Sequence, residues 1–291
     1  MDNNEKLLRM EQLLLNEAEG LLNERAMAEM GADPKDEEGC RQAAAMLLMY
    51  AFGMDPMEKE EDRAFMHGWL LPSLRMLSPT PFEENAYVRK VRFAEQEVGS
   101  IRLTKLRYAP YELFPAGDLT MDEAGRLRAP LGFFGRAFEC PMLTQNGREW
   151  MALKPNEMIT MERYVERAHG EVLVLGLGLG YYAHQISLKK EVKKVTVVER
   201  ERETMELVER WLLPQFEERG KIALVEGDAV EMMRRHGDGR KVDYVFADLW
   251  HDAGDGLPIY HELKAIEKGW AEGPEVGYWI EDTMKMYDGE N

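Results

Sequence analysis

The chain has 291 residues, 45% of them hydrophobic and 31% charged, which is enough for two domains with a real core. Its 54 acidic and 37 basic residues give a net charge of −17, which disfavours nucleic acid, because binding to phosphates depends on Lys and Arg. We find no membrane-length apolar run, no signal-peptide pattern and only two cysteines, so we expect a cytoplasmic protein with no membrane partner and no zinc or disulfide framework.

The first region, residues 1–80, has a helical pattern. It predicts one helix from about Asn4 to the Gly31–Pro34 segment, then helices over about 37–52 and 58–71. An apolar stripe runs along the first helix, either packing on the chain's own body or forming the seam of a homodimer. Its members are Leu7, Leu8, Leu14, Leu15, Leu21 and Leu22.

The second region, residues 81–168, has the texture of a small β-rich element. Residues 100–108 alternate apolar and charged side chains with one slip. Asn146-Gly147 lies between two further strand-like runs, and both residues tolerate the positive φ of a type I′ turn. The sequence therefore predicts an antiparallel hairpin with its turn at 146–147.

The third region, residues 169–291, repeats strand, turn and helix. This alternation predicts an α/β fold with a doubly wound, mostly parallel Rossmann-like sheet. The expected strands cover 171–175, 194–198, 221–225, 242–247 and 276–280, and the expected helices cover 180–190, 201–218, 228–236 and 257–271.

Ligands of such sheets bind beyond the carboxyl ends of the strands, so the residues at these ends are the candidates for a site. The first strand is followed by a glycine turn, residues 176–181, where a ligand can approach the backbone. Glu199 ends the second strand, 23 residues after Gly176 (199 − 176), and can accept both ribose hydroxyls. Asp228 follows the third strand and can bind an adenine amine or simply cap a helix. Asp248 follows the fourth, and the four ends together predict a bound adenosine.

The glycine turn also discriminates between adenosine cofactors. Tyr181 occupies the position where a dinucleotide fingerprint needs a third glycine or alanine, and no P-loop Lys-Ser/Thr pair is present. S-adenosylmethionine, which has no phosphates, or its decarboxylated form, fits best. The expected cofactor-binding residues are Gly176, Leu177, Gly178, Gly180, Tyr181, Glu199, Arg200, Asp228, Ala229 and Asp248.

These residues resemble the motifs of the class I S-adenosylmethionine-dependent methyltransferase superfamily. Residues 172–180 are similar to its first motif, Glu199 to its second, 227–229 to its third, and 243–248 to the strand that reaches the reaction centre. The resemblance implies a transferase, most simply a methyltransferase acting on a small molecule or a protein.

Within that superfamily the pattern is closest to spermidine synthase-like proteins, which are aminopropyltransferases. Val174 is aliphatic where many methyltransferases have an acidic residue, and Glu157-Met158-Ile159 resembles a short sequence those proteins carry. Asp248 falls at their catalytic aspartate, which implies that it accepts a proton from an attacking amine. An aminopropyltransferase with a small cationic substrate is therefore an alternative.

Some positions depart from the family. Leu179 replaces an aspartate in the glycine turn, and His251 stands where another aspartate is usual. Only 43 residues follow Asp248 (291 − 248), so the closing antiparallel hairpin of the fold is expected to be reduced or absent. A non-catalytic interaction protein that retains the fold is a further alternative.

The segment 248–261 concentrates polar side chains and is expected to be a loop. Its acidic and histidine residues lack diagnostic metal-ligand spacing, so no metal is expected. Asp248 and His251 are the expected catalytic residues, as base or amine anchor and as proton carrier, with Trp250 as a platform. The alternative is an exposed polar loop in which Trp250 packs under the adjacent helix.

Overall fold

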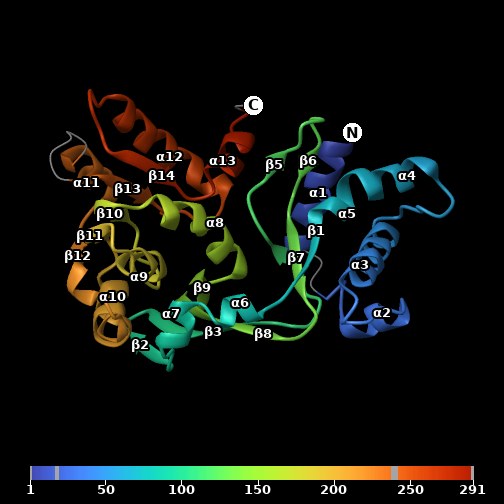
Figure 1. Ribbon diagram of the computed structural model, residues 1–291, viewed down its shortest axis with the longest axis horizontal. Coiled ribbons are helices and arrows are strands. Elements are labelled where there is room, and N and C mark those ends of the chain that lie inside the picture. The colour runs from blue at the N-terminus through green and yellow to red at the C-terminus, as the bar shows by residue number, and fades with distance from the viewer. Residues whose placement is uncertain (1, 17–19, 237–241, 290–291) are drawn as a thin grey trace. The chain divides into compact units, whose positions relative to one another are not determined.

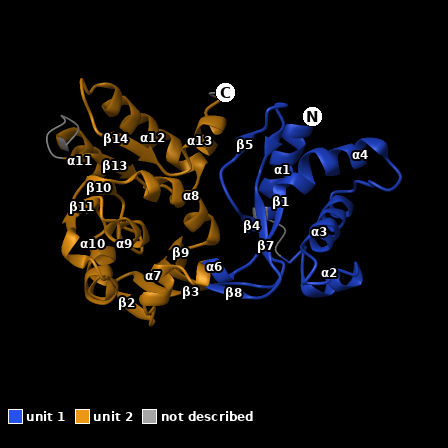
Figure 2. Cartoon of the chain, in the orientation of Figure 1, with its two compact units in different colours: residues 1–81, 107–139 blue, residues 82–106, 140–291 orange. Residues whose placement is uncertain are grey.

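The computed structural model describes residues 2–16, 20–236 and 242–289. The chain forms two compact units, residues 1–81 with 107–139 (unit 1) and residues 82–106 with 140–291 (unit 2), coloured separately in Figure 2. This division differs from the three regions read from the sequence. The stretch 81–168, expected to be one small β-rich element, is shared between both units.

Unit 1 combines helices with short strands (Figure 1). Strands β1, β7 and β4 form a sheet in that order, and β5 pairs with β6. The helical elements are α1 (Asn3–Asn16), α2 (Glu24–Glu29), α3 (Glu37–Ala51), α4 (Glu60–Phe65), the π-helical η1 (Met66–Leu70) and α5 (Leu71–Ser73), with α6 (Thr80–Glu83) at the unit boundary. The strands are β1 (Leu74–Leu77), β4 (Phe114–Pro115), β5 (Thr120–Met121), β6 (Leu127–Arg128) and β7 (Leu131–Phe134).

The prediction of one long first helix is wrong, because α1 and α2 are separate. Gly20 has φ 79°, which no helix continues through, and the Asn23 side chain accepts a hydrogen bond from the Ala26 N–H to start α2. Residues 17–19 lie outside the described part. Leu7, Leu14 and Leu22 of the apolar stripe are buried within the chain itself, and the side chain of Leu15 is not described.

Unit 2 begins with helix α7 (Ala86–Lys90) and an antiparallel sheet of order β2-β3-β8-β9. Asn146 and Gly147 have φ values of 51° and 77°, so the predicted hairpin is confirmed with both turn residues left-handed. The strands are β2 (Gln96–Val98), β3 (Ile101–Tyr108), β8 (Phe138–Gln145) and β9 (Arg148–Ala152).

The main sheet of unit 2 has five parallel strands in the order β12-β11-β10-β13-β14, which confirms the parallel α/β prediction. The strand order reverses between β10 and β13, so the ends of these central strands open onto one crevice. Within residues 242–289 no strand follows β14, the place where the closing antiparallel hairpin was expected to be reduced or absent. The strands are β10 (Gly170–Leu175), β11 (Val192–Glu199), β12 (Ile222–Glu226), β13 (Tyr244–Ala247) and β14 (Glu275–Tyr278).

Two helices of unit 2 differ from the prediction. The segment 201–218 breaks into α10 and the shorter turns η2 and η3, because Pro214 lacks the N–H that a continuous helix needs. Helix α12 begins at Ala253, because Asp252 and Asp255 form a capping box. The elements are α8 (Pro155–Arg167), α9 (Tyr181–Ser187), α10 (Arg202–Leu207), η2 (Val208–Leu212), η3 (Leu213–Gln215), η4 (Arg219–Lys221), α11 (Ala229–His236), α12 (Ala253–Lys268) and α13 (Glu281–Tyr287).

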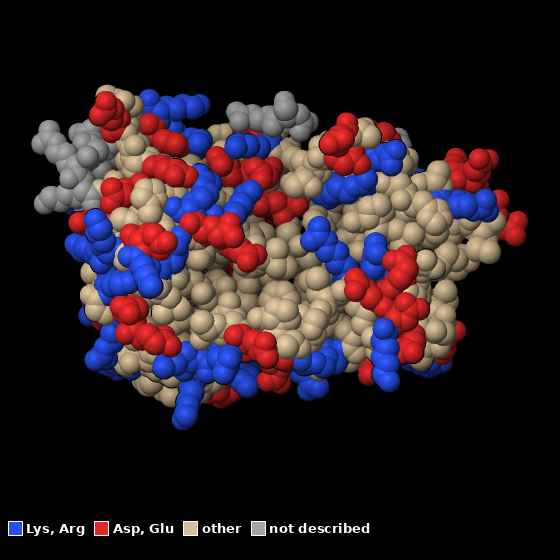
Figure 3. Space-filling model, in the orientation of Figure 1, with Lys and Arg blue, Asp and Glu red and all other residues tan. Residues whose placement is uncertain are grey.

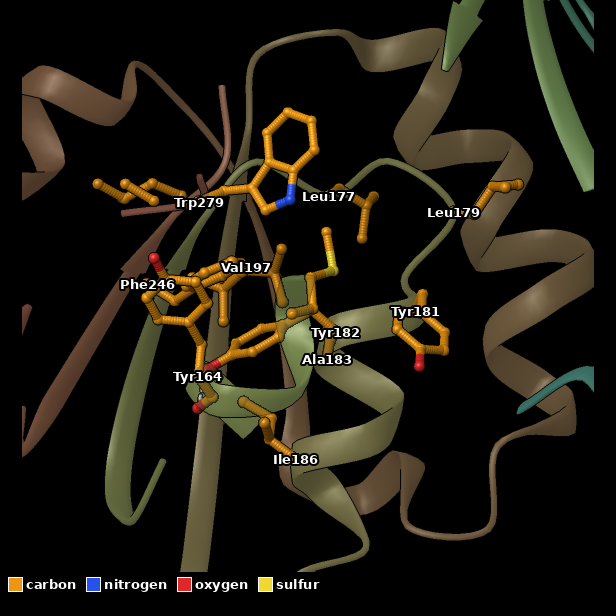
Figure 4. Close-up of a cluster of buried hydrophobic side chains, with 14 of the residues drawn as sticks. Tyr164, Leu177, Leu179, Tyr181, Tyr182, Ala183, Ile186, Val197, Phe246 and Trp279 are labelled. Carbon is orange, nitrogen blue, oxygen red and sulfur yellow. Dashed lines mark hydrogen bonds between the residues drawn. The ribbon is translucent and has the colours of Figure 1, made fainter. Parts of the chain in front are cut away.

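The core of unit 2 lies between the sheet and its helices. Tyr182 stacks on Phe246 with ring centroids 3.9 Å apart, and Tyr164 packs on the same ring (Figure 4). Tyr182 donates to the carbonyl of Tyr164 at 3.0 Å, so the hydroxyl is satisfied although the ring is buried. This aromatic layer supports the glycine turn from below. No helix in the described ranges combines the length and apolarity needed to cross a membrane.

We expect Gly147→Ala to lower the free energy of unfolding by about 1 kcal/mol, because an L-residue is strained in the left-handed region. Space is not limiting, since no atom lies within 4 Å of the added Cβ. Gly220→Ala is the matched control: its Cβ also meets nothing within 4 Å, but its φ is not positive. Urea unfolding of both variants tests this, and equal stabilities would contradict it.

Candidate cofactor site

A cavity of about 610 Å³ lies at the carboxyl ends of strands β10, β11, β12 and β13 in unit 2, and we call it the strand-end cavity. Its volume is in the range of small-molecule sites. Nine of the eleven residues predicted from the strand ends line it: Gly176, Leu177, Gly178, Glu199, Arg200, Asp228, Ala229, Asp248 and His251.

The glycine turn forms one wall because its backbone has to come unusually close to the next strand. Gly176 has φ 101°, and a Cβ there would collide with the carbonyl oxygen of Asp248. The Gly176 N–H donates to the carbonyl of Val198 at 2.9 Å, and the Asp248 N–H donates to that of Leu175 at 2.9 Å. Gly178 has φ 50°, and a Cβ there would approach the Met151 methyl group to 2.9 Å. The backbone contact makes glycine necessary at position 176, and the left-handed φ favours it at position 178.

Glu199 is held rigidly at the tip of β11. Its Oε2 accepts the Leu177 N–H at 3.1 Å and its Oε1 accepts the Glu201 N–H at 2.8 Å. A carboxylate has about four acceptor sites, so two remain after these bonds. The side chain is thus oriented beforehand, with capacity left for the two hydroxyls of a ribose.

Asp228 lies at the next strand end and caps α11. Its Oδ1 accepts the Glu231 N–H at 2.9 Å, which is the ordinary capping role considered as an alternative. The residue also lines the strand-end cavity, as do its neighbour Ala229 and Arg200, which follows the adjacent strand β11. Capping uses one oxygen, so the other is available to accept an amine hydrogen.

Gly180 and Tyr181 are the two predicted residues that do not line the strand-end cavity. Gly180, with φ 75°, starts α9 and faces the ring of Phe216. Tyr181 is buried, and its hydroxyl accepts from the amide of Asn85 at 3.2 Å. Figure 4 shows Tyr181 beside the start of α9, away from Trp279. These two residues shape the turn from behind.

Leu179 lies in the glycine turn, and its side chain is fully enclosed. Its carbonyl accepts the hydroxyl of Tyr87 at 2.5 Å, so helix α7 supports the turn on its outer side. An ionised carboxylate would be costly in this apolar position. The substitution therefore belongs to the core and leaves the strand-end cavity unaffected.

A pair of carboxyl groups, Glu157 of α8 and Asp248, lies at one end of the strand-end cavity. Burial raises the pKa of Asp248 to about 7, opposed by the nearby His251. Burial raises the pKa of Glu157 well above its usual value, and the negative charge of Asp248 raises it further. Neither carboxyl accepts a hydrogen bond from the described residues. Both shifts favour the protonated form, so the pair binds a proton more tightly than two exposed carboxyl groups would.

Glu157 was noticed in the sequence only as part of a family resemblance, and its role in the cavity was missed. It lies in the first turn of a helix that leads into β10, and this position was the available signal. Lys154, one turn earlier, forms an ion pair with Glu149 of β9 at 2.6 Å. The hairpin of β8 and β9 therefore contributes a wall that no motif announced.

His251 is oriented by two neighbours. Its Nδ1 lies 3.0 Å from Oδ2 of Asp255, and the Trp150 ring packs against the imidazole with centroids 5.1 Å apart. The expectation of a loop over 248–261 is wrong, because α12 begins at Ala253. His261 lies outside the cavity lining and contacts Asp288 at 3.1 Å.

Trp250 lines the strand-end cavity, where a platform was expected, and it also packs under helix α12, as the alternative interpretation predicted. It is 6% exposed, and its ring lies against Gly256, where a Cβ would come within 2.6 Å of it. Its Nε1 is buried without a hydrogen-bond partner among the described residues. The described side chains also include no group of three or more potential ligands arranged to hold a metal ion.

The lining of the strand-end cavity is strongly acidic. Its carboxylates are Glu149, Glu157, Glu199, Asp228, Asp248, Asp252 and Asp255, against two cationic side chains, Lys154 and Arg200. On the face of the molecule in Figure 3, Lys and Arg are interspersed with Asp and Glu and form no continuous basic area. A phosphate is poorly matched to such a cavity, and a cation is well matched.

No protein-family model matches the chain, and no curated protein is detectably similar to it. Solved structures similar to part of it include spermidine synthase from Thermotoga maritima, with 15% identity, 43% of this chain and 45% of that one covered, and a TM-score of 0.33. Spermidine synthase in complex with the transition state analogue AdoDATO has 15% identity, 46% and 47% coverage, and a TM-score of 0.34. A precorrin 8W decarboxylase from Methanobacterium thermoautotrophicum has 20% identity, 38% and 53% coverage, and a TM-score of 0.27. The chain thus spans about half the length of each.

We expect the stability of the wild type to fall, relative to Asp248→Asn, by about 2 kcal/mol between pH 5 and pH 8. The folded-state pKa of Asp248 is raised from 3.8 to about 7, so the folded protein binds the proton more tightly than the unfolded chain. The resulting stabilisation is complete at low pH and is lost as the pH rises through 7. Thermal unfolding across this range tests it, and parallel pH profiles for the two proteins would refute it.

Proposed function

We propose that this chain is a transferase that binds S-adenosylmethionine in the strand-end cavity and transfers a group, most simply the methyl, to a small molecule or a protein. The observation that carries the proposal is Glu199, whose carboxylate is fixed by the N–H groups of Leu177 and Glu201 with acceptor capacity left for a ribose. Gly176 and Asp228 flank it in the same cavity.

The arrangement of the helices supports this site. With right-handed crossovers, the connections from β10 to β12 and those returning to β13 and β14 lie on opposite faces of the sheet. Helix α8 contacts α9, and α12 contacts both α11 and α13. These two groups fit the doubly wound form of the fold, in which ligands bind where the strand order reverses.

We expect Asp248 to accept the proton that the acceptor loses. When bound, the cofactor supplies an alkyl group activated on sulfur, and the protein has to keep the attacking atom neutral. A carboxyl with a pKa of about 7 accepts a proton at neutral pH and releases it again. His251, oriented by Asp255, lies close enough to affect the charge of Asp248 and offers the proton a route onward.

We expect Glu199→Gln to weaken binding of S-adenosylhomocysteine by about 30-fold, because the amide accepts at one atom only and the charge is lost. Titration calorimetry measures this. Glu226→Gln is the matched control, since Glu226 ends the neighbouring strand in register with Glu199 but is exposed and lies outside the cavity lining. Absence of binding by the intact protein, or equal affinities for both variants, would rule the proposal out.

The acidic lining favours a second candidate, a spermidine synthase-like aminopropyltransferase. Decarboxylated S-adenosylmethionine lacks the carboxylate and carries two positive charges. Only Lys154 and Arg200 are available in the lining to bind a carboxylate, and Lys154 is already paired with Glu149. The cavity therefore matches the decarboxylated cofactor electrostatically at least as well as the parent one.

For this candidate we expect release of 5′-methylthioadenosine from decarboxylated S-adenosylmethionine that depends on putrescine. Asp248→Asn should slow it by about 100-fold or more, because general-base catalysis is lost. Chromatography of the nucleoside products measures the rate. With S-adenosylmethionine as the donor instead, formation of S-adenosylhomocysteine together with a methylated acceptor would favour methyl transfer.

A further inference from the structure

The Glu157–Asp248 pair is the most unusual feature of the strand-end cavity, because two half-buried carboxyl groups face one space without a cationic partner of their own. Asp248 comes from the end of β13 and Glu157 from the first turn of α8. Both line the cavity, and no described residue donates a hydrogen bond to either carboxylate. Unpaired acidic groups in a semi-enclosed site favour a ligand that brings a positive charge.

We propose that the Glu157–Asp248 pair is a cation subsite that takes the sulfonium of the cofactor, so that the chain binds S-adenosylmethionine more tightly than the neutral thioether S-adenosylhomocysteine. This inference rests on the proposed function and adds to it a means of discriminating charged cofactor from spent product. The two ligands share adenosine, ammonium and carboxylate, and differ only in the charged methyl-bearing sulfur.

The groups around the pair are consistent with this assignment. Lys154, in the loop before α8, is the nearest cation, but Glu149 of β9 already holds it at 2.6 Å. His251, at the start of the segment that leads to α12, affects Asp248 from the other side and is itself held by Asp255. Cys140 of β8 lies behind the group, and burial raises the pKa of its thiol to about 12, so it stays uncharged. Lys154 lowers the pKa of Glu157 and His251 lowers that of Asp248, but burial outweighs both effects, and neither carboxyl has an ion-pair partner of its own among the described residues.

Proton linkage follows from this geometry. Burial without an ion-pair partner raises the pKa of both Glu157 and Asp248 and so favours a protonated pair when no ligand is bound. A fixed positive charge beside the pair favours its ionised form, so binding of the sulfonium releases a proton. The affinity for S-adenosylmethionine should therefore rise as the pH rises through 7, whereas the affinity for the thioether should not.

The experiment is titration calorimetry with S-adenosylmethionine and S-adenosylhomocysteine at pH 6 and pH 8, in buffers of different ionisation enthalpy. For the wild type at pH 8 we expect a preference for the sulfonium of about 10-fold or more, with proton release for that ligand alone. In Glu157→Gln the preference should fall to about 3-fold or less, with affinity for the thioether retained. Retained thioether binding also shows that the variant is folded.

Asp228→Asn is the matched control, because it changes a carboxylate to an amide at the adenine end of the same cavity and keeps a good helix cap. It should weaken the binding of both ligands alike and leave the ratio of their affinities unchanged. If both ligands bind and Glu157→Gln changes neither the ratio of their affinities nor the proton release, the cation subsite is overturned and the proposed function is left intact. Binding of neither ligand by the wild type would overturn both.

Discussion

The close approach of Gly176 to the carbonyl of Asp248 is the constraint on which the rest of the site depends. It is possible only without a Cβ, and it brings the ends of β10 and β13 together. The Gly176 N–H is bonded to β11 at the same point, so three strand ends are tied within one turn of chain. Glu199 and Asp248 are therefore placed by the sheet itself and need no flexible loop to position them.

The second determinant of the site is the electrostatic character of the strand-end cavity. The strand-end cavity collects carboxylates from β9, α8, the start of α12 and the ends of three strands, β11, β12 and β13. It has only two cationic side chains, and one of them, Lys154, is already paired with Glu149. Fields focused by a low-dielectric crevice act on a ligand more strongly than the same charges on an open surface. The net charge of −17 is thus less informative than the local arrangement. The carboxylates of Glu199 and Asp228 accept backbone hydrogen bonds, whereas those of Glu157 and Asp248 accept none from the described residues.

Much of this could be predicted from the sequence, because parallel strands and the turns after them carry local signals. The apolar runs gave every strand of the main sheet to within a few residues, and the left-handed Asn146-Gly147 turn was explicit in the dipeptide. The strand-end residues lie close together because parallel strands have their carboxyl ends at the same edge of the sheet. The capping box at Asp252 and Asp255 was also present in the sequence, but the polarity of the segment was interpreted as a loop.

What could not be predicted depends on contacts between distant segments. The burial of Leu179 depends on α7, and the orientation of His251 depends on Trp150, about a hundred residues away along the chain. Glu157 becomes a site residue only because α8 brings it to Asp248, and no spacing rule connects positions 157 and 248. Tyr181 was assigned to the cofactor because it ends a motif, yet a motif does not specify which side of a turn its last side chain occupies.

The unpaired carboxyl groups also bear on whether the fold is retained for structure alone. Enclosing Glu157 and Asp248 without partners costs stability, and amide or apolar side chains of similar size would avoid that cost. A scaffold that served only to present a surface gains nothing from the pair, whereas a site for a positively charged ligand recovers the cost when the ligand binds. The geometry therefore argues for a binding function at the strand ends, and the same carboxyl groups that recognise a charge are placed to move a proton once an acceptor lies beside them.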